Sequence, residues 1–167
     1  MRSIVSILLI TPFLCFGQER KTDSASINEI VRKIDRLSKT NNRLFTKDKL
    51  TGHKKYKETW QYFDNKVSSR IVIDYTIDSA EYSVACTEKY YFKDGSLICA
   101  YESEIVFSPA EGIDQGTKWA GDFYFSKGKL VDHVTIGHGN SESDDWDPER
   151  EILQKFKKRK AELKLLK

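Results

Sequence analysis

Two residues of this 167-residue sequence, Asp122 and His133, could act as a general acid and base. If Lys127-Gly128 forms the turn of a hairpin, Asp122 faces His133 across the two strands, and a carboxylate beside an imidazole can move a proton. The sequence places no nucleophile and no second carboxylate beside them. We therefore predict a surface ion pair. The alternative is a small hydrolase-like enzyme whose acid–base groups are either this pair or Glu88.

Glu88 is the second residue whose position suggests a function. Alternation along its strand puts Glu88 on an apolar face with Tyr90, opposite Tyr101 on the next strand. An unpaired carboxylate is costly to bury, so Glu88 lies either at an uncovered end of the sheet or in a ligand pocket with tyrosine hydroxyls. The candidate binding residues are Glu88, Tyr90, Tyr101, Tyr75 and Trp119.

The histidines and the acidic loop lack the spacing of known metal sites. His53, His133 and His138 are not part of a His-Glu-x-x-His motif, and no Cys-x-x-Cys pair accompanies them. The carboxylates of loop 137–147 could hold calcium, but they do not have EF-hand spacing. The sequence also lacks a glycine-rich phosphate loop and a nucleophile elbow, so we predict no metal, no cofactor and no catalytic residue.

Cys86 and Cys99 lie in the two strands of one predicted hairpin. The register separates them by four positions, which is roughly 13 Å at about 3.3 Å per residue. A disulfide needs Cα atoms within about 7 Å of each other. We predict two free, buried thiols, and a disulfide brought into reach by a β-bulge is the alternative.

Residues 1–17 have the three-part pattern of a secretory signal peptide. A positive charge precedes an apolar run over residues 4–16, which is shorter than the roughly 20 residues of a membrane span. Cys15-Phe16-Gly17 then places small residues at positions −3 and −1 of a cleavage site before Gln18. We predict export to the periplasm or the extracellular space, with lipid attachment at Cys15 as the alternative.

The composition of the chain is that of a globular protein. Hydrophobic residues make up 39%, charged residues 32% and aromatic residues 12%, which excludes a fully disordered chain and a multi-span membrane protein. After cleavage, residues 18–167 have the length of one domain. The predicted organisation is therefore a signal peptide and a single α+β domain.

Charge is unevenly distributed along the chain. Residues 18–70 contain 14 basic and 7 acidic side chains, residues 71–148 contain 5 and 15, and residues 149–167 contain 8 and 3. We interpret this as basic terminal elements that lie over or beside an acidic sheet. The alternative is that the basic ends contact anionic lipid. Nucleic acid is not an expected partner, because the chain carries an export signal and no known nucleic-acid module.

A helix is predicted at each end of the domain. Ser26-Ile27-Asn28-Glu29 is a capping box, and apolar residues follow it at helical spacing as far as residues 38–39. Asp147-Pro148-Glu149 combines a capping side chain, a proline at the first helical position and an acid in the first turn. The second helix is basic, and it is either a solvated surface helix or one that binds a membrane surface or a partner.

Three hairpins are predicted between the helices. A Tyr-Phe pair followed by a turn recurs at residues 62–66, 91–95 and 124–128. Around the strongest turn, at residues 94–95, Phe92 would face Leu97 and Tyr90 would face Cys99. The predicted fold is α+β, with the N-terminal helix packed on a curved antiparallel meander of about six strands and a basic C-terminal helix.

These features favour an exported, non-enzymatic binding or interaction protein. It would use one aromatic-rich face of the sheet to hold a small ligand or a protein partner that the sequence does not identify. Besides the enzyme, the remaining alternative is an envelope-associated structural protein. Its basic C-terminal helix would tether it through weak contact with a membrane surface.

Overall fold

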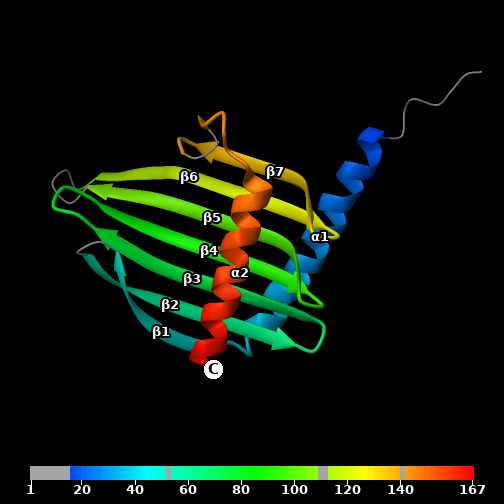
Figure 1. The fold of residues 1–167 in the computed structure, drawn as a ribbon, viewed down its shortest axis with the longest axis horizontal. Coiled ribbons are helices and arrows are strands. Elements are labelled where there is room, and N and C mark those ends of the chain that lie inside the picture. The colour runs from blue at the N-terminus through cyan, green and yellow to red at the C-terminus, as the bar shows by residue number, and fades with distance from the viewer. Residues whose placement is uncertain (1–15, 52–53, 109–112, 140–141) are drawn as a thin grey trace, which may run out of the picture.

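The computed structural model describes residues 16–51, 54–108, 113–139 and 142–167. Within these residues, helix α1 (Phe16–Ser38) precedes seven strands, and helix α2 (Pro148–Leu166) follows them (Figure 1). The strands are β1 (Arg43–Thr51), β2 (Lys54–Asn65), β3 (Ser68–Asp78), β4 (Ser83–Lys93), β5 (Ser96–Ser108), β6 (Ile113–Ser126) and β7 (Lys129–Gly137). Of the predicted export signal, residues 1–15 lie outside the described residues.

The strands form one curved, open sheet in the order β1-β2-β3-β4-β5-β6-β7, and each strand is antiparallel to the next. This confirms the α+β meander with a helix at each end. The sheet has one strand more than the expected six, because β1 pairs with β2 along the edge. The sequence of β1 hides this strand, since Leu44 and Leu50 are exposed at 71% and 64% and Phe45, on the other face, is only half-buried.

Helix α1 ends at Ser38, as predicted, but it begins at Phe16 and not at Ser26. The expected capping box therefore lies inside the helix. The segment before it is rich in Gln, Glu, Arg and Lys and contains no proline or glycine after Gly17, so nothing in it stops a helix.

The two helices cover opposite faces of the sheet. In Figure 1, α2 crosses in front of the strands and α1 passes behind them. Three residues of α2 pack on one face and are almost fully buried: Ile152, Phe156 and Leu163. On the other face, Ile27 and Ile34 of α1 pack against Phe63, Tyr91 and Cys99.

The hairpin of β4 and β5 starts in the predicted register and then leaves it. Asp94 and Gly95 both have positive φ, at 49° and 79°, and Phe92 pairs with Leu97 as expected. A bulge after this pair adds Ile98 to β5, so that Tyr91, not Tyr90, pairs with Cys99. The expected pairing of Tyr90 with Cys99 is therefore wrong, and so is every pair beyond it.

A bulge at the same place shifts the hairpin of β6 and β7. Phe125 pairs with Leu130, as the predicted turn requires, and Val131 is the added residue. Ile98 and Val131 both pack in the cluster beside α1, so each bulge adds an apolar side chain to that face. The turn residues alone do not indicate this shift, since each turn begins in the predicted register.

Candidate functional site

Glu88 lies on β4 beneath α2, and only 8% of it is exposed. Tyr75 and Tyr90 donate hydrogen bonds to its two carboxylate oxygens over 3.2 and 2.9 Å. Of the two positions expected for Glu88, the structure shows the one with tyrosine hydroxyls, and the alternative at an uncovered end of the sheet is wrong. The remaining side of Glu88 is taken by Arg159 of α2, whose Nη2 and Nε donate to Oε1 and Oε2 over 2.5 and 2.8 Å.

Two further carboxylates are buried beside Glu88, and we name the three the carboxylate cluster: Glu58, Glu88 and Glu102. Glu58 of β2 is fully buried and accepts from Arg159 Nη1 over 2.9 Å and from Trp60 Nε1 over 3.0 Å. Arg159 therefore joins two acidic residues from different strands. Its Nη1 also donates to Glu162 of α2 over 3.0 Å.

Glu102 of β5 completes the carboxylate cluster and has a different cation. Lys155 Nζ donates to its Oε2 over 2.7 Å, and the Tyr90 hydroxyl lies 3.2 Å from its Oε1. The same hydroxyl bonds Glu88, yet it has only one proton to donate. A proton on Glu102 would let that carboxyl donate to Tyr90 while Tyr90 donates to Glu88.

The pKa values of Glu88 and Glu102 are shifted in opposite directions, as this hydrogen-bond arrangement suggests. Burial opposes ionisation of Glu88, but the hydrogen bonds and charge of Arg159 outweigh it and hold the pKa of Glu88 below its ordinary value. Burial raises the pKa of Glu102, and Lys155 offsets only part of that effect. Of these two residues, Glu88 therefore stays ionised more firmly, and Glu102 takes up a proton more readily.

The carboxylate cluster fastens α2 to the sheet. The guanidinium of Arg159 fills the space beside Glu88 that a ligand would need, and it also lies 5.6 Å from the centre of the Trp60 ring. Sequence reasoning missed Glu58, Glu102 and both cations of α2, because only the packed helix brings them together. The available signal was a pair of basic residues, Lys155 and Arg159, spaced four apart within an apolar stripe.

The other two predicted binding residues lie apart from the cluster. Tyr101 faces the α1 side of the sheet, where Lys89 Nζ lies 4.7 Å from the centre of its ring. The expected position of Tyr101 opposite Glu88 is wrong, because Glu88 pairs with Glu102. Trp119 is buried on the α2 side and packs against Phe123 at 6.2 Å between ring centres. Its indole Nε1 has no hydrogen-bond partner within the part of the chain that the structure describes.

Asp122 and His133 do not face each other, so the predicted ion pair is wrong and these two residues do not form an acid–base pair. The bulge in this hairpin pairs Asp122 with Val134 and His133 with Phe123. The His133 ring stacks on Phe123, with 6.3 Å between ring centres and 5° between planes. Burial raises the pKa of Asp122, which lies on the other face of the sheet.

Cys86 and Cys99 are free and buried, as predicted. They lie on opposite faces, Cys86 under α2 beside Glu88 and Cys99 in the cluster beside α1. Burial raises the pKa of Cys86 to about 11 and that of Cys99 to about 12. Both thiols therefore stay protonated at neutral pH.

The acidic loop caps a helix. Asp147 accepts a hydrogen bond from Arg150 N over 3.0 Å, and His138 Nδ1 lies 2.5 Å from Glu142 Oε1. Within the described ranges, no three His, Cys, Asp or Glu residues are grouped as metal ligands. In the same ranges, neither helix has the length and the apolar character of a membrane span.

A second surface lies where three turns of the meander meet, and we call it the hairpin end. It comprises the β2–β3, β4–β5 and β6–β7 turns with the adjoining parts of α1 and α2 (Figure 1). Its exposed lysines are Lys33, Lys66, Lys93, Lys127, Lys129, Lys157 and Lys164. Among the residues described, none of these lysines has a carboxylate within 4.0 Å.

Two grooves open at the hairpin end. The α1 groove has a volume of about 530 Å³, and its lining residues are Ile30, Lys33, Ile34, Leu37, Asn65, Lys66, Val67, Ser68 and Lys93. The α2 groove has a volume of about 390 Å³ and lies between α2 and the β4–β5 turn, where Leu97 and Phe156 form its floor. Both grooves place apolar side chains among lysines.

Comparison of the chain with protein families, with curated proteins and with solved structures finds no match.

Proposed function

We propose that the protein is an exported, non-enzymatic binding protein that docks on an anionic lipid surface through its hairpin end. The observation that carries this proposal is the group of exposed lysines there, which have no carboxylate partner among the described residues. Unpaired cations on one end of a protein attract a surface of opposite charge. Export itself is a prediction from residues 1–17.

Apolar side chains among the lysines favour lipid over an acidic protein or a nucleic acid. Leu37 and Val67 are 43% and 53% exposed, and both lie within the hairpin end. A lipid surface offers acid headgroups to the lysines and acyl chains to these two residues. Phosphate contacts alone would not require exposed apolar residues.

The charges of the opposite end are mixed. Asp78 at the end of β3 and Glu81 in the β3–β4 turn are exposed there, and so are Lys55 and Lys57 of β2. An anionic surface therefore attracts the hairpin end more strongly, and the molecule is turned with the hairpin-end lysines toward the lipid. The basic helix that the sequence suggested as a tether takes part, because Lys157 and Lys164 belong to the hairpin end.

The face that the sequence favoured for binding is a poorer candidate. Helix α2 lies on Glu88 and Tyr90, and Arg159 occupies the polar positions around them. A ligand could reach these groups only after α2 had left the sheet. The hairpin end needs no such rearrangement.

Co-sedimentation with vesicles tests the proposal. Protein without the export signal is mixed with vesicles of phosphatidylcholine, alone or with phosphatidylglycerol, at low and at high salt. We expect binding to the anionic vesicles only, and we expect salt to weaken it. Replacing Lys93 and Lys127 by Gln should reduce the affinity roughly 10- to 30-fold, at about 1 kcal/mol for each lysine near the surface.

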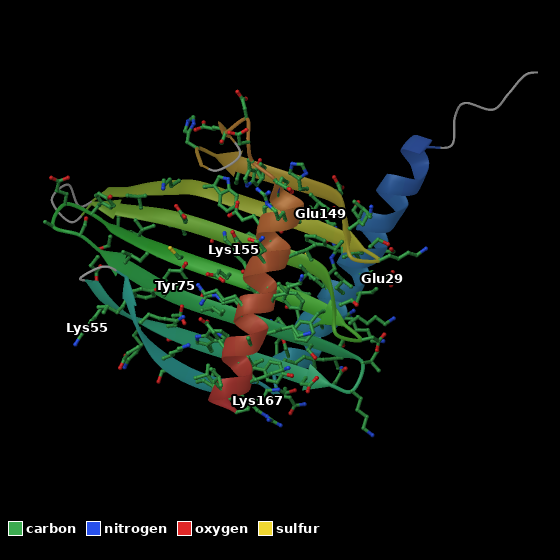
Figure 2. The ribbon with its side chains drawn as sticks, viewed as in Figure 1. Glu29, Lys55, Tyr75, Glu149, Lys155 and Lys167 are labelled. Atoms are coloured by element: carbon green, nitrogen blue, oxygen red, sulfur yellow. The ribbon has the colours of Figure 1, made fainter. Side chains whose placement is uncertain are left out.

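Lys55→Gln with Lys57→Gln is the matched control. These exposed lysines lie on β2, and Figure 2 places Lys55 at the end of the sheet away from the hairpin turns. The control removes the same charge and should leave binding nearly unchanged. An equal loss in both double variants, or equal binding to neutral vesicles, would overturn the proposal.

A further inference from the structure

We infer that the α1 groove binds a single-chain anionic amphiphile, with its chain between α1 and the β2–β3 turn and its acid group among three lysines. The inference deepens the proposed function and rests on it, because it names what the hairpin end takes up. It concerns one molecule held in one groove, whereas docking on a surface involves the whole hairpin end. The two can therefore be tested separately.

The walls of the α1 groove are apolar and come from separate elements. Ile30, Ile34 and Leu37 follow one another at helical spacing, so they share one side of α1. Val67 belongs to the β2–β3 turn, on the other side of the groove. Ile34 is 1% exposed at the base, while Leu37 and Val67 are 43% and 53% exposed, so an entering chain would displace water from both.

The charged groups of the α1 groove also come from separate elements. Lys33 lies on α1, Lys66 in the β2–β3 turn and Lys93 at the end of β4. The backbone holds the two turns together, because Asp94 N donates to the carbonyl of Val67 over 3.0 Å. Three cations around one opening repel one another, and an anionic headgroup between them relieves that repulsion.

Two uncharged polar side chains of the groove bind each other. Asn65 Oδ1 accepts from the backbone and the hydroxyl of Ser68 over 2.9 and 3.1 Å. The lysines are the charged groups of the groove, and they select for negative charge. The volume of about 530 Å³ lies within the range of small-molecule sites.

The α2 groove is a weaker candidate for the same ligand. Lys160 there donates to the carbonyl of Gly95 over 3.0 Å, and its Nζ lies 5.5 and 5.2 Å from the ring centres of Phe92 and Phe156. One cation of that groove is therefore held by the protein itself. Its volume, about 390 Å³, is also smaller.

Isothermal titration calorimetry with dodecanoate, kept below its micellar concentration, tests the inference. Dodecanol supplies the same chain without the charge, and butanoate supplies the charge with a short chain. We expect dodecanoate to bind at one site and to bind at least about tenfold more tightly than either comparison compound. Lys33→Gln with Lys66→Gln should weaken dodecanoate binding to a similar degree.

Substitutions at the rim locate the chain. Leu37→Glu and Val67→Glu each put a carboxylate into the α1 groove at a partly exposed position, where the fold should tolerate it. We expect each to reduce dodecanoate affinity at least about tenfold. Leu44→Glu, on the exposed side of edge strand β1, is the matched control and should bind as the unmodified protein does.

The outcomes separate this inference from the proposed function. No dodecanoate binding, or unchanged binding by Leu37→Glu and Val67→Glu, overturns the inference even if anionic vesicles are bound. If dodecanol binds as tightly as dodecanoate, the lysines do not recognise the acid group, and that part of the inference is overturned. Dodecanoate binding that is lost in both rim variants supports the inference, and it does so even if vesicles are not bound and the proposed function fails.

Discussion

At the scale of single residues, Arg159 links helix α2 to two strands of the sheet. It is 8% exposed and binds two buried carboxylates, those of Glu58 and Glu88. A buried carboxylate without its cation is strongly unfavourable, whereas a fully hydrogen-bonded pair is tolerated. The stability of the sheet face under α2 therefore depends on this one guanidinium.

Replacing Arg159 by Met should lower the free energy of unfolding by about 3–5 kcal/mol, because Glu58 and Glu88 lose their cation while they stay buried. Urea denaturation followed by circular dichroism measures the change. Lys158→Met is the control, since this neighbouring lysine is exposed. A loss below about 1 kcal/mol in Arg159→Met would mean that the cluster does not fasten α2.

The opposite pKa shifts of Glu88 and Glu102 predict opposite responses to pH. Folding lowers the pKa of Glu88 from 4.5. The contribution of Glu88 to the free energy of unfolding is therefore complete above pH 4.5, and it is lost as the pH falls through the folded pKa. Folding raises the pKa of Glu102 from 4.5. The contribution of Glu102 to the free energy of unfolding is therefore complete below pH 4.5, and it is lost as the pH rises through the folded pKa.

Urea unfolding at a series of pH values tests this pair of residues. Glu88→Gln should make the loss of stability in acid shallower than in the unmodified protein. Glu102→Gln should remove a decrease in the free energy of unfolding that begins above pH 4.5 in the unmodified protein. Parallel pH profiles for the two variants would contradict the opposite pKa shifts of Glu88 and Glu102.

At the scale of elements, Gly128 and Gly137 have the same left-handed backbone but different surroundings. Their φ angles are 79° and 83°. A Cβ at Gly128 would meet nothing within 4 Å, whereas a Cβ at Gly137 would collide with the carbonyl of Lys118 on the neighbouring strand. The first position constrains only the turn, and the second constrains how closely β7 approaches β6.

Gly128→Ala should therefore cost about 1–2 kcal/mol, the usual penalty for an L-residue in this conformation. Gly137→Ala should cost distinctly more, because β6 or β7 must also move. Thermal unfolding of the two variants side by side measures the difference. Equal losses would show that β7 shifts freely away from its neighbour.

Elements and turns could be predicted where the information is local. The turn at Asp94-Gly95 and the cap at Asp147 are encoded within a few residues, and the structure confirms both. The bulges after Phe92 and Phe125 could not be predicted. They place Ile98 and Val131 against α1, and the reason for them is absent from either strand taken alone.

At the scale of the whole molecule, the basic C-terminal segment covers acidic residues of the sheet, as the charge pattern suggested. Lys155 and Arg159 neutralise carboxylates that come from β2, β4 and β5. The same helix contributes Ile152, Phe156 and Leu163 to the larger core cluster. Helix α2 is thus part of the domain and not an appendage.

Removing residues 148–167 should abolish cooperative unfolding and expose the core cluster to water. The lost contacts include three buried side chains and both cations of the carboxylate cluster. Dye binding to exposed apolar surface and the loss of a sigmoidal urea transition measure this outcome. Removal of Lys167 alone should have little effect, and a truncated chain that still unfolded cooperatively would contradict this role of α2.

The sequence by itself determined the two helices, the three hairpins between them, the cap of α2, the shared face of Glu88 and Tyr90, and the burial of the two thiols. These depend on alternation, capping and turn chemistry, which act over a few residues. Tertiary structure alone decided the register beyond each bulge, the separation of Asp122 from His133 and the cation that Glu88 binds. Such contacts join residues far apart in the chain, and they exist only after both helices have packed on the sheet.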